Sequence, residues 1–140
     1  MAKKILLKAR LILIDKGRVL LMKQKNSIGG NYTLVGGTVE DFEFAKLSLV
    51  RESKEETGIT LNEKNLVLVH TLHKKKGPYT RIVLYFETNA WKGKPIAQET
   101  WKFKKVSWFD LEDLPTELSP TVKHVLSKYR KGITYSEYSV

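Results

Sequence analysis

The sequence predicts an α/β protein in which a mixed β-sheet lies between helices. Short stretches with strand-like composition, bounded by turn residues, recur along the chain. Two longer segments, 43–57 and 119–129, have the boundary residues and apolar spacing of helices instead. No internal repeat, low-complexity tract or linker interrupts the 140 residues. We therefore expect one domain over residues 1–140.

The strands are predicted from short apolar or alternating stretches. These lie at 9–14, 19–22, 32–35, 66–69, 81–86 and 104–109. Asp15–Arg18 supplies the first turn, and Asn26–Asn31, with its paired glycines, supplies a loop. The third stretch runs into Gly36–Gly37. We expect Lys74–Pro78 to form the loop between the fourth and fifth strands.

The first helix is expected to begin near Glu43 and to end at Thr57, with Gly58 as its left-handed C-terminal residue. Its apolar residues lie on two sides, so we expect it to pack both through Leu47 and through Leu49.

The second helix is expected to begin at Ser119–Pro120, a capping residue followed by proline at the first helical position. Its apolar residues then recur at i, i+3, i+4 and i+7, and these are Val122, Val125, Leu126 and Tyr129.

An acidic cluster interrupts this basic chain. Six of the fifteen acidic residues lie within 40–56, although the net charge is +10. On a helix Glu52, Glu55 and Glu56 occupy positions i, i+3 and i+4, with Cβ atoms roughly 5–6 Å apart. Like charges at this spacing destabilise a helix. A hard divalent cation, which prefers oxygen ligands, would offset the repulsion; a solvated acidic face is the alternative.

The same segment resembles the Nudix box. The pattern Gly-x5-Glu-x7-Arg-Glu-x-x-Glu-Glu-x-Gly is filled by Gly37, Glu43, Arg51, Glu52, Glu55, Glu56 and Gly58. The sequence departs from the family at Ser53, which is usually aliphatic, and at Val35, where proline commonly precedes the two glycines. Residues 91–115 are similar to the later part of MutT-like Nudix hydrolases. The resemblance therefore runs from about Arg10 to the C-terminal helix.

This resemblance implies a Nudix fold and a hydrolase whose cofactor is Mg²⁺ or Mn²⁺. Glu52 and Glu56 are the expected metal ligands, followed by Glu55 and by the carbonyl oxygen of Gly37. Mg²⁺ usually takes one or two protein carboxylates per ion. Three helical glutamates therefore indicate more than one ion, or one ion and a carboxylate that is free to act as a base.

The catalytic candidates are Glu52, Arg51 and Glu99. Glu52 can serve as the general base, and Glu99 is the best base candidate outside the box; an exposed loop acid is its alternative reading. A helical Glu43 would lie about 180° around the helix from Glu52, so it could not bind a cation from that face. The resemblance makes it a structural partner of Arg51 instead. Arg51 is thus expected to orient its neighbours, with an i, i+4 pair to Glu55 as the alternative.

Three residues are candidates for substrate binding. Tyr32 and Trp101 could stack on a base, and Lys23 follows the second strand, where related enzymes contact substrate. The alternative is that these residues have no role in binding. Aromatic residues at sheet edges commonly belong to the core, and a lysine is commonly solvated.

The net charge of +10 can be interpreted in several ways. It could be a solvated surface, or an electrostatic funnel that speeds the association of a phosphate-bearing substrate. The stretch Trp101–Lys105 mixes aromatic and basic residues, as in polynucleotide binding, but it equally fits an alternating strand. We expect a small nucleotide substrate and no specific nucleic-acid partner.

Composition excludes other classes. The chain has no cysteine, so disulfides and thiolate sites are ruled out. Met1–Leu7 resembles the start of a signal peptide, but Lys8 and Arg10 interrupt the apolar run. No run approaches the length of a membrane span. We expect a cytoplasmic monomer or homodimer without a membrane partner.

The expected function is hydrolysis of a nucleoside diphosphate linked to another moiety, preferentially a nucleoside triphosphate cut to monophosphate and pyrophosphate. The alternatives are a dinucleoside polyphosphate or nucleotide-sugar hydrolase, and a non-catalytic Nudix module that binds a nucleotide or RNA. The retention of Glu52, Glu55 and Glu56 argues against the module, which has no need of three carboxylates that repel one another.

Overall fold

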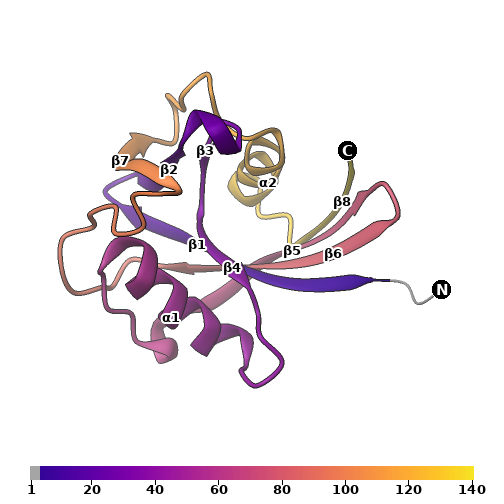
Figure 1. The fold of residues 1–140 in the computed structure, drawn as a ribbon, viewed down its shortest axis with the longest axis horizontal. Coiled ribbons are helices and arrows are strands. Elements are labelled where there is room, and N and C mark those ends of the chain that lie inside the picture. Colours follow the sequence, from indigo (N-terminus) through magenta and orange to yellow (C-terminus); the bar gives the residue numbers. More distant parts are fainter. Residues whose placement is uncertain (1–3) are drawn as a thin grey trace.

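The computed structural model describes residues 4–140, so Met1–Lys3 of the basic start lie outside the described chain. The strands are β1 (Ile5–Asp15), β2 (Arg18–Gln24), β3 (Tyr32–Thr33), β4 (Val35–Thr38), β5 (Val67–Lys76), β6 (Tyr79–Thr88), β7 (Phe103–Asp110) and β8 (Tyr135–Ser139). The helices are α1 (Ala45–Thr57) and α2 (Pro120–Arg130), with short 3₁₀ turns at Asn26–Ile28 and Glu63–Asn65. Figure 1 shows α1 and α2 on opposite faces of the strands, as predicted.

The sheet is mixed and is built around β1. Its strand order is β3-β2-β1-β6-β5-β8, with β4 also paired to β1 and β7 also paired to β2. The pairs β1/β6 and β5/β8 are parallel, and the others are antiparallel. β1 pairs with β4 over Lys8–Leu11, whereas only Ile14 and Asp15 at its end pair with β2. This branching brings β4 alongside the middle of β1.

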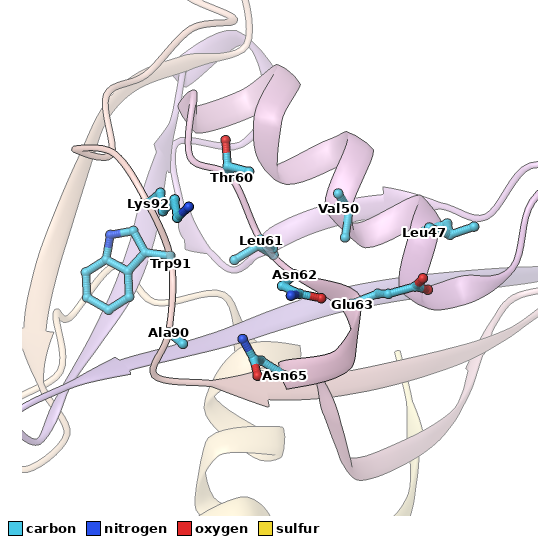
Figure 2. Close-up of a pocket in the computed structure, with 10 residues that line it drawn as sticks. All are labelled: Leu47, Val50, Thr60, Leu61, Asn62, Glu63, Asn65, Ala90, Trp91 and Lys92. Atoms are coloured by element: carbon cyan, nitrogen blue, oxygen red, sulfur yellow. The ribbon is translucent and has the colours of Figure 1, made fainter.

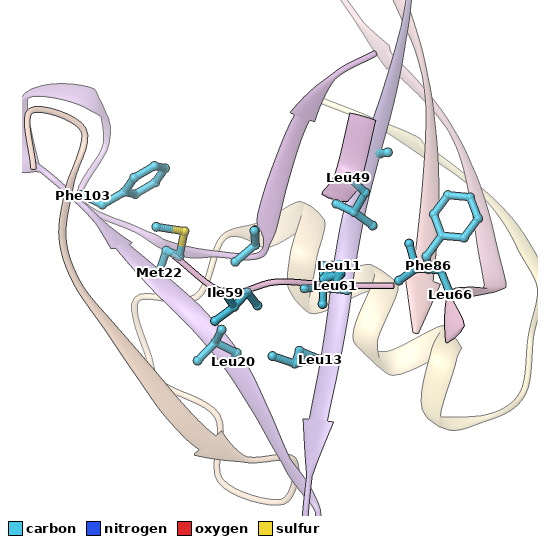
Figure 3. Packing of buried hydrophobic residues seen from close by; sticks show 12 residues of the cluster. Leu11, Leu13, Leu20, Met22, Leu49, Ile59, Leu61, Leu66, Phe86 and Phe103 are labelled. Atoms are coloured by element: carbon cyan, nitrogen blue, oxygen red, sulfur yellow. The ribbon is translucent and has the colours of Figure 1, made fainter. Parts of the chain in front are cut away.

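The alternation of side chains along β1 divides the core in two. Leu11 and Leu13 face α1, where they join a cluster that includes Leu49 and Phe86, seen in Figure 3. Ile12 faces the other way, into a cluster with three apolar residues of α2, Val122, Val125 and Leu126. The stripe predicted for the second helix is therefore confirmed.

Two strand predictions were wrong in their boundaries. The stretch 32–35 is divided between β3 and β4, and both Gly36 and Gly37 lie within β4. At Gly36 φ is +138°, and an added Cβ would come within 2.1 Å of the Ala9 carbonyl oxygen. These glycines therefore permit a close strand pairing and do not end a strand. The lysines expected in a loop belong to β5, because its pairing with β6 continues to Lys76 and Tyr79.

Helix α1 begins at Ala45, two residues later than predicted, so Glu43 lies in the preceding loop and its expected helical angle does not apply. The predicted end is confirmed: Gly58 has φ +77°, and its N–H donates to Lys54 O at 2.9 Å. The prediction that α1 packs on two sides is only partly confirmed, because Leu49 is buried while Leu47 is 47% exposed. Among the described residues, no helix has the length and apolar composition needed to cross a membrane.

β8 was not predicted from the sequence, because this short strand carries serine and glutamate among its tyrosines. It pairs with β5 through contacts that are distant in sequence. The fully buried His70 fastens the two strands, because Nδ1 lies 2.7 Å from Ile133 O and Nε2 lies 2.7 Å from Ser136 Oγ. β8 thus forms the edge of the sheet next to β5 and contacts α2.

Ser53, the departure from the aliphatic pattern, is fully buried and its hydroxyl has no hydrogen-bond partner. Ser53→Ala should raise the free energy of unfolding by about 1 kcal/mol, because it removes an unpaired buried polar group. Thr57 is the matched control, since its buried hydroxyl donates to Ser53 O at 2.7 Å. Thr57→Val should lower stability by about 1 kcal/mol. Urea denaturation in EDTA measures both, and a destabilising Ser53→Ala would contradict the assignment.

Candidate active site

Glu56 is the most enclosed of the helical carboxylates, with only 4% of the residue exposed. Its Oε1 accepts a hydrogen bond from the Gly36 N–H at 2.8 Å, which fastens the last turn of α1 to β4. Burial raises the pKa of Glu56 to about 7, although that hydrogen bond and the charge of Arg10 oppose the rise. The charges of Glu52 and Glu99 raise it further. A carboxylate in this state gains from a nearby cation.

The glycines of β4 make room for the carboxylates. A Cβ on Gly37 would come within 2.8 Å of Glu52 Oε1, so the strand backbone lies directly against the Glu52 side chain. Glu52 is itself partly buried, and burial is the main reason that its pKa is raised. The predicted ligands Gly37, Glu52 and Glu56 are thus brought together at the contact between α1 and β4.

Glu99 reaches the same place from a different part of the chain. The loop between β6 and β7 is fastened to the end of α1, because Gln98 N–H donates to Glu56 O at 2.9 Å and Ile96 N–H donates to Thr57 O at 3.0 Å. The Glu99 side chain is only 16% exposed, and its charge raises the pKa of both Glu52 and Glu56. Its Oε1 is buried without a hydrogen-bond partner.

Arg51 holds the outer side of the cluster. It makes two hydrogen bonds to Glu43, at 2.6 and 3.1 Å, and this pair lowers the pKa of Glu43 to about 2. The structural pairing predicted for Glu43 is thus confirmed. Arg51 also lies 3.2 Å from both Glu52 and Glu55, so the i, i+4 pair is present as well. Part of the repulsion within the cluster is therefore offset by the protein itself.

The donor atoms of the cluster suit a hard divalent cation, but the side chains are not yet arranged around one position. Its donors are carboxylate oxygens, which such ions prefer, and Glu99 offers an oxygen with no other partner. Within residues 4–140, however, no three acidic or histidine side chains are already gathered as a cation site. Glu52 and Glu55 are turned toward Arg51. Binding an ion would require these side chains to change rotamer.

The predicted substrate residues are placed differently from one another. Tyr32 is 6% exposed and packs edge-on against Phe109 with ring centroids 4.9 Å apart, so it belongs to the core. Lys23 Nζ lies over the Tyr32 ring at 4.8 Å from its centroid. Trp101 is 64% exposed and lies two residues from Glu99. Of the two aromatic candidates, Trp101 is the one with an exposed ring.

A wide cavity lies elsewhere in the described part of the chain. It measures about 530 Å³ and lies between Leu47 and Val50 of α1 and the segment that carries Trp91, as Figure 2 shows. Its walls include Glu63 but none of the clustered glutamates. Size alone would misplace the site, because the carboxylates lie on another side of α1.

Arg10 lies beside the site but was not predicted from the sequence as a site residue. Its Nη1 donates to Leu34 O at 3.0 Å and to Gly36 O at 3.1 Å, which supports the backbone of the glycine strand. Its charge also opposes the rise in the Glu56 pKa. The available signal was a charged residue inside the apolar stretch 9–14.

The carboxylates of this α/β/α protein come from a helix and a docked loop beside a glycine strand, and their oxygens are the donors that hard cations prefer. The chain matches the NUDIX domain family over residues 6–129. It therefore belongs to that family.

Two curated relatives are similar to the chain. An ADP-ribose pyrophosphatase of Methanocaldococcus jannaschii is 33% identical over 105 residues, covering 74% of this chain and 61% of the relative. The nucleoside diphosphate-linked moiety X motif 6 protein of Xenopus laevis is 28% identical over 126 residues, covering 86% and 55%. The chain thus spans about 55–61% of the length of these relatives.

Solved structures share the fold. The MutT NUDIX hydrolase of Burkholderia pseudomallei superposes with a TM-score of 0.81 at 24% identity, covering 89% of this chain and 97% of that one. At this identity the match establishes the fold, which is MutT-like.

The raised pKa of Glu56 predicts how stability varies with pH in the absence of metal. The folded protein binds the Glu56 proton more tightly than the unfolded chain, so this contribution is complete below about pH 4.5 and is lost as pH rises to about 7. The loss is on the order of 3 kcal/mol at 1.36 kcal/mol per pKa unit. Urea denaturation in EDTA should show it in the wild type but not in Glu56→Gln.

Glu43→Gln is a control in which the expected pH dependence of stability has the opposite sign. The pKa of Glu43 is lowered to about 2, so its stabilising contribution is present above about pH 4.5 and is lost as pH falls toward 2. An identical pH profile for wild type and Glu56→Gln between pH 4.5 and 7 would contradict the assignment.

Proposed function

We propose that the chain is a divalent-metal-dependent Nudix hydrolase that cleaves a nucleoside diphosphate linked to another moiety. The preferred substrate is a nucleoside triphosphate, cut to monophosphate and pyrophosphate. The observation that carries this proposal is the convergence of Glu52 and Glu56, which lie against the glycine strand β4, with Glu99 from a separate loop. Each of the two helical glutamates has a raised pKa, which a structural surface acid does not need.

Glu52 and Glu56 would hold Mg²⁺ or Mn²⁺, with Glu55 and the Gly37 carbonyl as further ligands. When bound, such an ion neutralises charge on phosphate oxygens and makes an attacking water more acidic. The Gly36 N–H keeps one oxygen of Glu56 in place. Because Glu56 is buried and would otherwise take up a proton near neutral pH, it stays ionised most readily with a cation beside it.

Glu99 is the proposed general base. Its Oε1 has no hydrogen-bond partner, and the nearest cation, Lys102 Nζ, lies 3.9 Å away. That oxygen makes no hydrogen bond within the protein, so it would be available as a proton acceptor once a water molecule reaches it. Glu52 is the second candidate, but one of its oxygens accepts from Arg51 at 3.2 Å. Arg51 and Glu43 serve to position the helix against the preceding loop.

The remaining roles follow from exposure and charge. Trp101 is proposed to stack on the base of the nucleotide, because its ring is open and lies close in sequence to Glu99. Lys23 is proposed to contact substrate from β2. A cytoplasmic location and a monomeric or homodimeric state stay predictions.

Of the two alternatives, one has specific support and the other does not. A nucleotide-sugar or dinucleoside polyphosphate hydrolase is favoured by the similarity to a protein named ADP-ribose pyrophosphatase. A non-catalytic module is disfavoured, because a buried, unpartnered Glu99 oxygen weakens the fold without serving a binding protein. Release of pyrophosphate or phosphate across nucleoside triphosphates, ADP-ribose and dinucleoside polyphosphates separates the three.

Glu56→Gln, Glu52→Gln and Glu99→Gln should each lower kcat by about 10²-fold or more on the best substrate, because each removes a ligand or the base. Steady-state kinetics at saturating Mg²⁺ measures the loss. Glu63→Gln is the matched control, an exposed glutamate outside the cluster, and should keep full activity. Unchanged turnover in Glu56→Gln would contradict the proposed metal site, and unchanged turnover in Glu99→Gln would return the role of base to Glu52.

Mg²⁺ or Mn²⁺ should raise the Tm, because an ion that binds only the folded state stabilises it by mass action. At a hundredfold excess over Kd the gain is about 2.7 kcal/mol. Thermal melts with and without metal should show the rise in wild type and Glu63→Gln, but not in the double variant Glu52→Gln/Glu56→Gln. A wild-type melt that millimolar Mn²⁺ leaves unmoved would indicate a solvated acidic face.

A further inference from the structure

A second polar cavity lies on the α2 face of the sheet and measures about 160 Å³. Four basic residues line it, namely Lys8, Arg10, Lys74 and Arg81. Among the described residues, its lining contains no acidic side chain. Gathering four cations at one small cavity costs free energy unless an anion shares the space.

The sheet register imposes this arrangement. Arg81 of β6 is directly opposite Lys74 of β5, so two like charges occupy one face of an antiparallel pair. On the other side of β6, Lys8 of β1 pairs with Val83, two residues along from Arg81. Residues two apart in a strand share a face. Lys8, Arg10, Lys74 and Arg81 therefore project from the same face of the sheet.

The protein does not neutralise these charges. Within residues 4–140 none of the four has a carboxylate oxygen within 4 Å. Arg81 Nε is buried without a hydrogen-bond partner. Burial and then the charges of Arg10, Arg81 and Lys74 lower the pKa of Lys8 to about 8. The four basic side chains therefore have no anionic partner within the described protein.

The start of α2 points to the same kind of ligand. Ser119, Thr121 and Val122, at the N-terminal end of this eleven-residue helix, also line the cavity. The first N–H groups of a helix have no partner within it, and the helix dipole favours an anion there. Thr121 Oγ1 accepts a hydrogen bond from Lys74 Nζ at 2.9 Å, so the lysine side chain is held beside the start of α2.

The volume narrows the choice of ligand. Pockets for whole organic ligands measure roughly 300–1,000 Å³, so a cavity of about 160 Å³ suits a single phosphate-sized group. A neutral base or sugar would leave all four charges unpaired. We propose that this basic pocket binds a phosphate group of the substrate that lies outside the diphosphate linkage being cleaved.

This inference rests on the proposed hydrolase function and narrows its substrate class. Arg10 joins the two sites, because its Nη1 donates to the Gly36 carbonyl while the Gly36 N–H donates to Glu56. One molecule can therefore present its diphosphate to the carboxylate cluster and a further phosphate to the basic pocket. A nucleoside triphosphate has such a further phosphate, whereas a nucleoside diphosphate linked to a neutral sugar does not.

The first test is binding of inorganic phosphate in EDTA, which involves no metal and no catalysis. Sodium phosphate should raise the Tm of the wild type above that in sodium chloride of equal ionic strength. Arg81→Gln and Lys8→Gln should each weaken phosphate binding by roughly tenfold or more, the loss expected for one hydrogen bond to a charged group. The control Lys64→Gln removes one exposed charge elsewhere and should bind like the wild type.

Both variants should fold, because Arg81 Nε has no partner to lose and removing a charge relieves repulsion. No phosphate-dependent rise in the wild type, or equal responses in wild type, Arg81→Gln and Lys8→Gln, would overturn the inference.

The second test uses ATP and ADP-glucose as a matched pair of substrates. Arg81→Gln should raise KM for ATP by roughly tenfold and leave KM for ADP-glucose unchanged, with little effect on either kcat. Equal changes for both substrates would overturn the inference. Charge-dependent phosphate binding without turnover of any nucleotide would refute the hydrolase and not the pocket, whereas turnover without such binding would refute the pocket alone.

Discussion

The hydrogen bond from the Gly36 N–H to the buried carboxylate of Glu56 is the contact on which the site depends. It joins the last turn of α1 to β4 at a residue with a positive φ, where any Cβ would collide with Ala9 O. The same turn of α1 receives the loop that carries Glu99, through the Glu56 carbonyl. Helix, strand and loop thus meet at one residue, and burial of its carboxylate raises its pKa.

Charge in this chain is separated across the middle of β1. The carboxylates gather beside β4, while Lys8, Lys74 and Arg81 gather on the α2 face, and Arg10 lies between the two groups. Neither group is neutralised fully by the protein: Arg51 reaches Glu52 and Glu55 but not Glu56, and the basic cluster has no carboxylate partner among residues 4–140. A metal ion with a polyphosphate would satisfy both groups at once, because it supplies cations to one and anions to the other.

Local sequence signals predicted well the features that depend on neighbours along the chain. The end of α1 at Gly58, the apolar stripe of α2 and the grouping of Glu52, Glu55 and Glu56 all follow from spacing within a single helix. The Arg51–Glu43 pair was also anticipated, although Glu43 lies outside the helix and reaches Arg51 from the loop. Errors arose where pairing partners decide the structure, as in the continuation of β5 through three lysines and in the addition of β8.

The sequence by itself determined the family and the helical half of the site, because the spacing of residues 37–58 is a local property that a helix converts directly into a shared face. Only the tertiary structure decided that Glu99 joins that face, that Tyr32 belongs to the core and that four basic residues share one cavity. Those outcomes depend on strand register and loop docking. Register is set by pairing and packing between segments distant in the chain, so no local pattern could reveal it.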